Sequence, residues 1–528
     1  MPIYPETEGL SSKWLRAKIA NFLPVYKDLI KDFLPKKIIE DQKLEPQNSA
    51  LQKIHFPKSY ADVTEARKRL AFDEVFLLQL ISLIKQIEWK STRIAPKMNV
   101  KKETIEKFKK NLPFELTSAQ QRAIGEIVND LKSEQPANRL LEGDVGSGKT
   151  VVAAVAALTA LDNGFDSLIA APTEILAFQH QKTLNEILKP FEIKVGIWTG
   201  SKKQKANITC GTHALLTSFK PQRQIGFVVV DEQHRFGVAQ RAKLFLDQPQ
   251  KLTPHLLTMT ATPIPRTLAL TLYGDLNLST LDKMPKGRQK ISTFVVPNSK
   301  RNNAYKFIEK HVREGRQAFI LTPFVEPSET MATVKSATVE FEKLKTKFPK
   351  KVKLGLLHGR LKSQEKETII GNFKKGKIDI LVATPVVEVG IDIPNATIML
   401  IESADRFGLA QLHQLRGRVG RGEHKSYCFL FTDSHFETSI RRLKSMEKLH
   451  AGFELAEVDL KMRGPGEILG LRQSGFIGFK IADISDHQTI ATAQTEAKKL
   501  LKLDPSLSRH QLLSQKLESL KLAYSEPN

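Results

Sequence analysis

The chain has 528 residues, of which 41% are hydrophobic, so it is long enough to form several domains that each bury a core. Its 81 Lys and Arg residues against 57 Asp and Glu residues give a formal net charge of +24, which favours nucleic acid as a partner over a merely lysine-rich surface. Cys210 and Cys428 stand alone, which argues against a disulfide framework or a zinc module, and without a recognisable signal peptide or membrane span a reducing, cytoplasmic compartment is expected.

Residues 1–110 are predicted to be mostly helical, because "DVTEARKRLAFDEVFLLQLISLIKQIEWK" carries apolar residues at helical spacing over many turns. From residue 111 short apolar strands alternate with helical stretches such as "TEILAFQHQKTLNEIL". The expected strands are "SLIAAP", "IGFVVVDE" and "HLLTMTAT". This alternation is typical of a doubly wound parallel α/β sheet.

A second α/β stretch follows, with strands expected at "RQAFILTPF", "KVKLGLLHG", "IDILVATP", "ATIMLIESAD" and "SYCFLF". We therefore predict two tandem α/β lobes over residues 111–284 and 285–432, with a cleft between them. Residues 433–528 return to a helical pattern.

The stretch "GDVGSGKT" (143–150) fits the phosphate-loop pattern G-x-x-x-x-G-K-[ST], follows an apolar segment and opens a helix. Glycines in such a loop let backbone N–H groups surround a phosphate at the helix N-terminus. The loop's glycines are Gly143, Gly146 and Gly148. Lys149 is predicted to contact the β- and γ-phosphates of ATP, and Thr150 to offer its hydroxyl to Mg²⁺. The strand and helix on either side disfavour a plain glycine turn.

Asp231 and Glu232 follow a run of β-branched residues, as expected for acids at the end of a buried strand. Beside a phosphate loop, Asp231 is predicted to hold Mg²⁺ and Glu232 to polarise the attacking water. A pair of helix-capping carboxylates is the alternative. His234 follows this pair, and we expect it to relay the nucleotide state to the second lobe or to DNA.

Two further stretches could complete a nucleotide site. In "FELTSAQQRAI", Phe114 could stack on a base and Gln120 could read the adenine edge, although Thr117 and Ser118 also suit a simple helix cap.

In "QLHQLRGRVGRG", Arg416, Arg418 and Arg421 lie between glycines. Arg418 and Arg421 are about one helical turn apart, so both could reach a γ-phosphate across the cleft as arginine fingers. Binding of a phosphate backbone by a basic loop is the alternative.

Together these stretches resemble a superfamily-two helicase, and within it the RecG-type DNA helicases. The signatures run in order as "LPFELTSAQQ", "NRLLEGDVGSGKT", "APTEILA", "GTHALL", "VVVDEQHRFGVAQR", "TMTATPIPRTLAL", "LLHGRL", "VATPVVEVGIDIPNA", "ESADRFGLAQLHQLRGRVGRG" and "RGPGEILGLRQSG". The resemblance covers residues from about 1 to about 500 and implies RecA-like lobes, ATP and Mg²⁺ as cofactors, and work on double-stranded DNA.

The resemblance assigns further residues. Thr260 and Thr262 couple hydrolysis to DNA. The strand-binding face of the first lobe is expected to be lined by Thr173, Glu174, Gly211 and Thr212. The contact with ATP and between the lobes is expected to include Glu388, Gly390 and Asp392. The segment 452–475 looks like the translocation motif of this family, whose polar candidates are Arg463, Glu467, Arg472 and Gln473.

The resemblance also implies partners and rivals. The expected substrate is branched DNA such as forks and Holliday junctions, which the enzyme remodels in repair and recombination when forks stall. We expect a monomer that works in the bacterial nucleoid. A single-stranded-DNA-binding protein is a further expected partner. The transcription-repair coupling factor, an RNA helicase and a zinc-bearing restart helicase fit the quoted motifs less well.

The wedge domain that members of the family usually carry is not recognisable in this sequence. Residues 1–110 instead resemble the bridging helices that follow the wedge domain. A DNA-stimulated ATPase or accessory fragment that cannot unwind without a wedge supplied elsewhere therefore stays open as an alternative.

Overall fold

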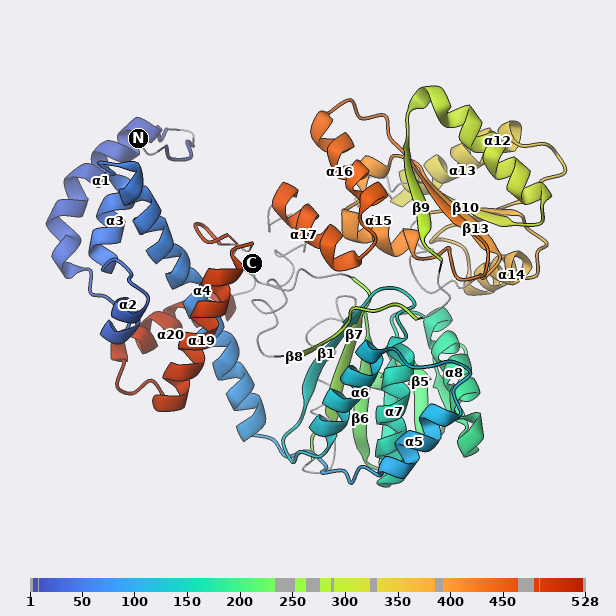
Figure 1. Cartoon of the computed structure of the whole chain (residues 1–528), viewed down its shortest axis with the longest axis horizontal. Coiled ribbons are helices and arrows are strands. Elements are labelled where there is room, and N and C mark those ends of the chain that lie inside the picture. Colours follow the sequence, from blue (N-terminus) through green and yellow to red (C-terminus); the bar gives the residue numbers. More distant parts are fainter. Residues whose placement is uncertain are drawn as a thin grey trace. The chain divides into compact units, whose positions relative to one another are not determined.

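The computed structural model describes residues 3–7, 9–232, 252–262, 276–285, 289–322, 330–384, 393–463, 479–483 and 485–525 (Figure 1). The chain forms two compact units. One comprises Met1–Glu88, Arg266–Asp275 and Arg463–Asn528, and the other comprises Trp89–Pro265 and Leu276–Met462. The second unit contains both α/β lobes, and the first is helical in its described part.

The first lobe is built on a sheet whose described strands run in the order β4-β3-β5-β2-β6-β7-β1-β8. These strands are β1 (Asn138–Gly143), β2 (Asp166–Ala170), β3 (Val195–Trp198), β4 (Lys203–Gln204), β5 (Ile208–Gly211), β6 (Ile225–Asp231), β7 (His255–Thr260) and β8 (Asn277–Leu281). All neighbours pair in parallel except the short β4, which is antiparallel to β3. The alternating pattern thus predicted the sheet correctly, with β4 as the departure.

Helices cover this sheet (Figure 1). They are α5 (Lys102–Lys110), α6 (Ser118–Leu131), α7 (Lys149–Asp162), α8 (Glu174–Leu188), the 3₁₀ turn η2 (Lys189–Phe191) and α9 (Ala214–Thr217). Helix α7 is buried on all sides from Val151 to Ala160, as expected for a helix that is apolar around its whole circumference. Its N-terminus is thereby fixed against the end of β1, which is where a phosphate loop needs it.

The second lobe has a fully parallel sheet in the order β11-β12-β10-β13-β14-β9. Its strands are β9 (Ile291–Val296), β10 (Gln317–Leu321), β11 (Leu354–Leu357), β12 (Ile380–Ala383), β13 (Ala396–Ile401) and β14 (Ser426–Phe431). Its helices and turns are η4 (Asn298–Lys300), α12 (Arg301–Arg313), α13 (Thr330–Lys347), α14 (Ser363–Lys374), η6 (Ala404–Arg406), α15 (Leu409–Arg416), α16 (Glu437–Lys448) and α17 (Gly452–Arg463). The predicted fold of two tandem α/β lobes with parallel sheets is confirmed.

The helical unit joins both ends of the chain around one core. Its elements are α1 (Ser12–Tyr26), η1 (Lys27–Leu29), α2 (Lys36–Asp41), α3 (Gln47–His55), most of α4 (Tyr60–Ser91), α19 (His487–Leu503) and α20 (Gln511–Ser525). Phe76 of α4, Ala497 of α19 and Leu513 of α20 belong to the same buried cluster. Nothing in the sequence pattern indicated that the two ends share a core.

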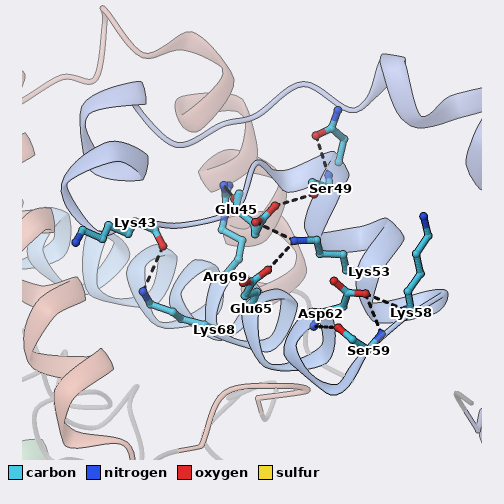
Figure 2. A network of polar contacts seen from close by, with 11 residues as sticks. Lys43, Glu45, Ser49, Lys53, Lys58, Ser59, Asp62, Glu65, Lys68 and Arg69 are labelled. Atoms are coloured by element: carbon cyan, nitrogen blue, oxygen red, sulfur yellow. Dashed lines mark hydrogen bonds and ion pairs between the residues drawn. The ribbon is translucent and has the colours of Figure 1, made fainter.

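Polar contacts tie α4 to the shorter helices before it. The ammonium of Lys53 lies 2.9 Å from Glu45 and 2.6 Å from Glu65, and Figure 2 shows it between these two carboxylates. Arg69 is fully buried and donates two hydrogen bonds to Asp32, at 2.9 and 2.6 Å, and one to Asp73 at 2.8 Å. A buried guanidinium needs such partners, so α4 is held in one register against the Asp32 segment.

Both cysteines, Cys210 and Cys428, are buried free thiols. Among the residues that the structure describes, no helix is both long enough and apolar enough to cross a lipid bilayer.

Candidate nucleotide site and nucleic-acid interface

The phosphate loop connects the end of β1 to the start of α7. Gly146 and Gly148 have φ values of +81° and +87°, a region that favours glycine. A Cβ on Gly148 would lie 2.3 Å from Nε2 of Gln120, so that position has no space for a side chain. The loop is thus held in a curled conformation by its glycines and by the residue beneath it.

Gln120 is the residue beneath the loop, and it is 1% exposed. Its Nε2 donates to the carbonyl of Ser147 at 2.8 Å, and its Oε1 accepts from the backbone N–H of Thr117 at 2.8 Å. In this conformation both ends of the amide support the loop and the cap of α6, as the helix-cap alternative expected. Reading of an adenine edge by Gln120 stays a prediction, as does stacking by Phe114, a residue that is 44% exposed.

Lys149 turns back onto its own loop and donates to the carbonyls of Gly143 and Asp144. Burial lowers the pKa of Lys149, while the carboxylates of Glu232 and Asp231 act in the opposite direction. The ammonium therefore sits among the loop carbonyls and the two predicted catalytic acids, at the place where a bound phosphate would attract it.

Asp231 ends β6 and accepts a hydrogen bond from the ring of His180, with 2.8 Å between Nε2 and Oδ2. The other ring nitrogen, Nδ1, lies 3.5 Å from the hydroxyl of Thr150. Burial alone would raise the pKa of Asp231, but the hydrogen bond and charge of His180 and the charge of Lys149 bring it below the usual value. One histidine thus connects both predicted magnesium ligands.

Magnesium fits this set of oxygens. A carboxylate and a hydroxyl beside a phosphate loop are hard oxygen donors, and Mg²⁺ in nucleotide sites takes one or two such protein ligands together with phosphate oxygens. Asp231 and Thr150 supply them, and both lie within reach of His180. His180 was missed by the sequence analysis, because a single histidine in the amphipathic "FQHQK" stretch carries no sign of the partner that it faces.

Glu232 has a φ of +52°, in the left-handed region that a non-glycine residue rarely adopts. Its backbone N–H donates to the carbonyl of Met259, and its carboxylate accepts from the hydroxyl of Thr260 at 3.4 Å and the N–H of Ala261 at 3.1 Å. The acid is therefore held against the end of β7 by the "TAT" stretch.

The same stretch reaches the second lobe. The N–H of Thr262 donates to the hydroxyl of Thr260 at 3.1 Å, and Nε2 of Gln414 donates to the hydroxyl of Thr262 at 2.8 Å. Gln414 belongs to α15, so a continuous series of polar contacts leads from Glu232 to the helix that precedes Arg418 and Arg421.

A second contact between the lobes involves the phosphate loop itself. Nε2 of His413 lies 3.0 Å from Oδ1 of Asp144, and the N–H of Gly452, at the start of α17, donates to Oδ2 at 3.3 Å. Arg416 contacts Nδ1 of His413 at 2.9 Å, and a guanidinium can only donate. His413 must therefore carry its proton on Nε2 and donate it to Asp144.

The three arginines of the motif lie in different environments. Arg416 is 3% exposed and donates to the carbonyls of Met446, Leu449 and His450, which makes it an anchor between α16 and α17. Arg418 is half-buried, and its neighbour Gly417 lies close to the phosphate loop, since a Cβ on Gly417 would be 3.2 Å from Cβ of Val145. Arg421 is also half-buried. The catalytic roles of Arg418 and Arg421 stay predictions.

The predicted strand-binding residues of the first lobe surround one turn. Thr173 caps α8 through its hydroxyl, which accepts from Leu176 at 3.4 Å. Both carboxylate oxygens of Glu174 accept from Ser201, one from its N–H at 3.0 Å and the other from its hydroxyl at 3.1 Å. Glu174 thus positions the turn after β3, and because a carboxylate repels phosphates, its predicted role in DNA binding would be indirect.

Gly211 and Thr212 lie on the other side of that turn. A Cβ on Gly211 would lie 2.1 Å from the carbonyl of Trp198, and the N–H of Thr212 donates to this carbonyl at 3.2 Å. The ammonium groups of Lys203 and Lys205 lie 5.4 and 5.7 Å from the centre of the Trp198 ring. This basic turn with its aromatic residue was missed, although "WTGSKKQK" does signal a surface that suits phosphates.

Several predicted residues lie outside the described part of the chain. These are His234, Glu388, Gly390, Asp392, Glu467, Arg472 and Gln473. Arg463 is the last residue of α17, but its side chain is likewise outside the description. Their roles stay predictions.

Three protein families match successive parts of the chain. Residues 117–271 match the DEAD/DEAH box helicases, and residues 299–423 match the helicase conserved C-terminal domain. Residues 449–525 match the C-terminal part of domain 3 of the ATP-dependent DNA helicase RecG.

Curated relatives are similar over nearly the whole chain. ATP-dependent DNA helicase RecG of Synechocystis is 44% identical over 531 residues, which cover 98% of this chain and 63% of that protein. RecG of Bacillus subtilis is 41% identical over 518 residues, which cover 95% of this chain and 75% of that protein. The chain therefore spans roughly two thirds to three quarters of the length of these two relatives.

A solved structure described as RecG bound to a three-way DNA junction is similar to this chain, with a TM-score of 0.75 and 40% sequence identity. The match covers 93% of this chain and 66% of that one. It includes the two α/β lobes and extends well beyond them into the helical unit.

Proposed function

Because the chain belongs to the RecG family, we propose that it is an ATP-dependent translocase on double-stranded DNA that remodels stalled forks and branched recombination intermediates. The observation that carries this proposal is the series of contacts from Glu232 through Thr260 and Thr262 to Gln414, which connects a predicted water-activating acid in one lobe to α15, the helix that precedes Arg418 and Arg421, in the other. An enzyme that only hydrolysed ATP would have no need of such a connection.

The proposed chemistry is phosphoryl transfer to water. The loop N–H groups and Lys149 bind the β- and γ-phosphates. Thr150 and Asp231 would hold Mg²⁺, which would supply positive charge to neutralise those phosphates. Glu232, fixed by Thr260 and Ala261, orients the attacking water and accepts its proton. Arg418 and Arg421 stabilise the negative charge that develops on the γ-phosphate.

Coupling to movement follows from the contacts between the lobes. When the γ-phosphate leaves, the charge that attracts Lys149 and Arg418 to one point is gone, so the balance between closed and open lobes shifts. Gln414 and His413 carry this shift into α15, and Arg416 carries it onward to the start of α17. The predicted translocation motif, 452–475, begins with that helix.

We propose that the basic turn of the first lobe binds the DNA backbone. Lys203 and Lys205 carry exposed positive charge next to the Trp198 ring, and Glu174 fixes the turn from behind. Such contacts to a phosphate backbone position a protein without reading sequence, which suits an enzyme that must move along any duplex.

The remaining predictions stay part of this proposal. We expect a monomer that works on forks and Holliday junctions in the bacterial nucleoid, with a single-stranded-DNA-binding protein as a candidate partner. The domain limits are proposed as 1–110, 111–284, 285–432 and 433–528.

The test compares ATP hydrolysis without DNA, with linear duplex and with a three-way junction, and measures unwinding of a synthetic fork in parallel. We expect both DNAs to stimulate hydrolysis, and the fork to be unwound. Stimulation without unwinding supports the alternative of a DNA-stimulated ATPase or accessory fragment. A hydrolysis rate that no DNA changes overturns the proposal.

A further inference from the structure

Glu74, near the middle of α4, binds the backbone of a segment more than 400 residues away in sequence. Its Oε1 accepts from the N–H of Lys480 at 3.2 Å, and its Oε2 accepts from the N–H groups of Ile481 at 3.1 Å and Ala482 at 2.9 Å. Three consecutive amides thus share one carboxylate. Hydrogen bonds to an ionised acceptor are about twice as strong as neutral ones, so this is a firm attachment for a segment without secondary structure.

Side chains reinforce the attachment. Phe479 and Ala482 pack against the core that α2, α4, α19 and α20 share. Immediately afterwards, Asp486 caps α19 by accepting from the N–H of Thr489 at 3.0 Å. The segment 479–482 is therefore fixed to α4 by main chain and side chains, and leads directly into a capped helix of the same unit.

The attached segment directly follows the predicted translocation residues in the chain. Residues 479–482 directly follow 464–478, which contain the predicted translocation residues Glu467, Arg472 and Gln473. On the other side of these residues, α17 is fixed to the second lobe, because Asp459 accepts from the N–H of Leu409 at 3.0 Å. Residues 464–478 are thus connected at one end to the lobe that carries α15 and at the other end to α4.

We propose that Glu74 is a positioning residue for translocation, which holds the C-terminal end of the translocation motif on α4. This rests on the proposed function. With that end fixed, the displacement of α17 during the ATP cycle is not lost as movement of the segment 479–482. Without Glu74, the segment 479–482 follows the displacement, and hydrolysis is no longer converted efficiently into movement along DNA.

The test uses the full chain with Glu74→Ala and Glu74→Gln. Glutamine keeps only one acceptor oxygen, so it can accept only some of the three backbone hydrogen bonds. The matched control is Glu65→Ala, another glutamate of α4, whose carboxylate binds the side chain of Lys53 rather than the backbone of a distant segment (Figure 2). Three quantities are measured: hydrogen exchange of the amides of 480–482, DNA-stimulated ATP hydrolysis, and displacement of a third strand from a triplex on linear duplex.

In Glu74→Ala we expect faster exchange at 480–482, an ATPase rate within about twofold of wild type, and a fall of at least about tenfold in triplex displaced per ATP, because small errors in positioning carry large costs. Glu74→Gln should lie between Glu74→Ala and wild type, and Glu65→Ala should match wild type in all three quantities. Glu74→Gln carries the test if the alanine variant does not fold.

Exchange that is unchanged in both Glu74 variants, or faster exchange with an unchanged ratio of displacement to hydrolysis, overturns the inference while the wild-type enzyme still moves. A wild-type enzyme that hydrolyses ATP but displaces no triplex instead overturns the proposed function itself, and the inference with it.

Discussion

His180 shows how far single residues could be predicted. The phosphate loop and the Asp231–Glu232 pair were recognisable because their chemistry depends on residues that are adjacent in sequence. The contacts of His180 with Asp231 and Thr150 join three separate segments of the chain, and one sequence has no signal for such pairings. Gln120 was recognised as important, but its buried amide supports the phosphate loop from beneath in this structure.

At the scale of single residues, we predict that His180→Ala lowers the apparent affinity for Mg²⁺ in ATP hydrolysis. The ring orients the carboxylate and hydroxyl that are proposed to hold the ion, and loss of such an orienting partner costs about 10–100-fold in metal affinity or activity. The Mg²⁺ concentration that gives half-maximal ATP hydrolysis should rise accordingly. The expected control is His311→Ala, a half-buried histidine of α12 in the second lobe, with an unchanged requirement. An equal magnesium requirement in wild type and His180→Ala would contradict this role.

Elements were predicted where the local pattern is strong. Strands β6, β7 and β10–β14 lie within the apolar runs from which they were predicted, and β2 begins one residue before its run, because a strand buried on both faces must be largely apolar. The strands that were not among those expected are β1, β3, β4, β5, β8 and β9. Of these, β8 and β9 lie at the edges of their sheets, and "NLSTL" and "ISTFVV" mix polar with apolar residues, so neither forms a continuous apolar run. Edge strands need less apolar surface.

Arg416 at the end of α15 is a structural residue, whereas Arg418, two residues further on, is proposed to be catalytic. Arg416→Ala leaves the carbonyls of Met446, Leu449 and His450 without their donor, so we expect the second lobe to lose about 3 kcal/mol or more. Arg418→Ala should change the melting temperature less, but lower ATP hydrolysis by about 10³-fold or more. Thermal unfolding and steady-state hydrolysis of the two variants check this pair. Equal melting temperatures for both would show that Arg416 is not the anchor.

Helix α4 should make stability depend on pH through Asp73. Burial raises the pKa of Asp73 from 3.8 to about 7, although Arg69 opposes this. Between these two pH values the folded protein keeps a proton that the unfolded chain releases. The contribution to stability is therefore fully present below about pH 4 and is lost as the pH rises through about 7.

Asp73→Asn removes this titration, so its melting temperature relative to wild type should increase as the pH rises from 4 to 8. Asp62→Asn is the control of opposite sign. Backbone hydrogen bonding from Lys58 lowers the pKa of Asp62 below 3.8, so that variant should lose stability relative to wild type as the pH rises through about 4, and its difference from wild type should change little from about pH 5 to 8. A melting-temperature difference between Asp73→Asn and wild type that does not vary with pH would contradict the assignment.

At the scale of the whole molecule, the sequence supplied the two lobes and the family but not the helical unit. Described residues within 33–83 and 479–520 share one core. The sequence could not predict this, because the pattern of an amphipathic helix shows that the helix packs against another element but not which element that is. The consequence for function is that the segment 479–482, which follows the predicted translocation motif in sequence, is attached to α4, whereas α17, where the motif begins, packs on the second lobe.

The central claim is that ATP hydrolysis drives movement along double-stranded DNA, and displacement of a third strand from a triplex on linear duplex measures that movement directly. We expect wild-type protein to displace the strand with ATP but not with a non-hydrolysable analogue. Glu232→Gln should still bind ATP, hydrolyse it at least about 100-fold more slowly, and displace nothing. Wild-type protein whose ATPase is stimulated by the duplex, yet which leaves the triplex intact, would contradict the account.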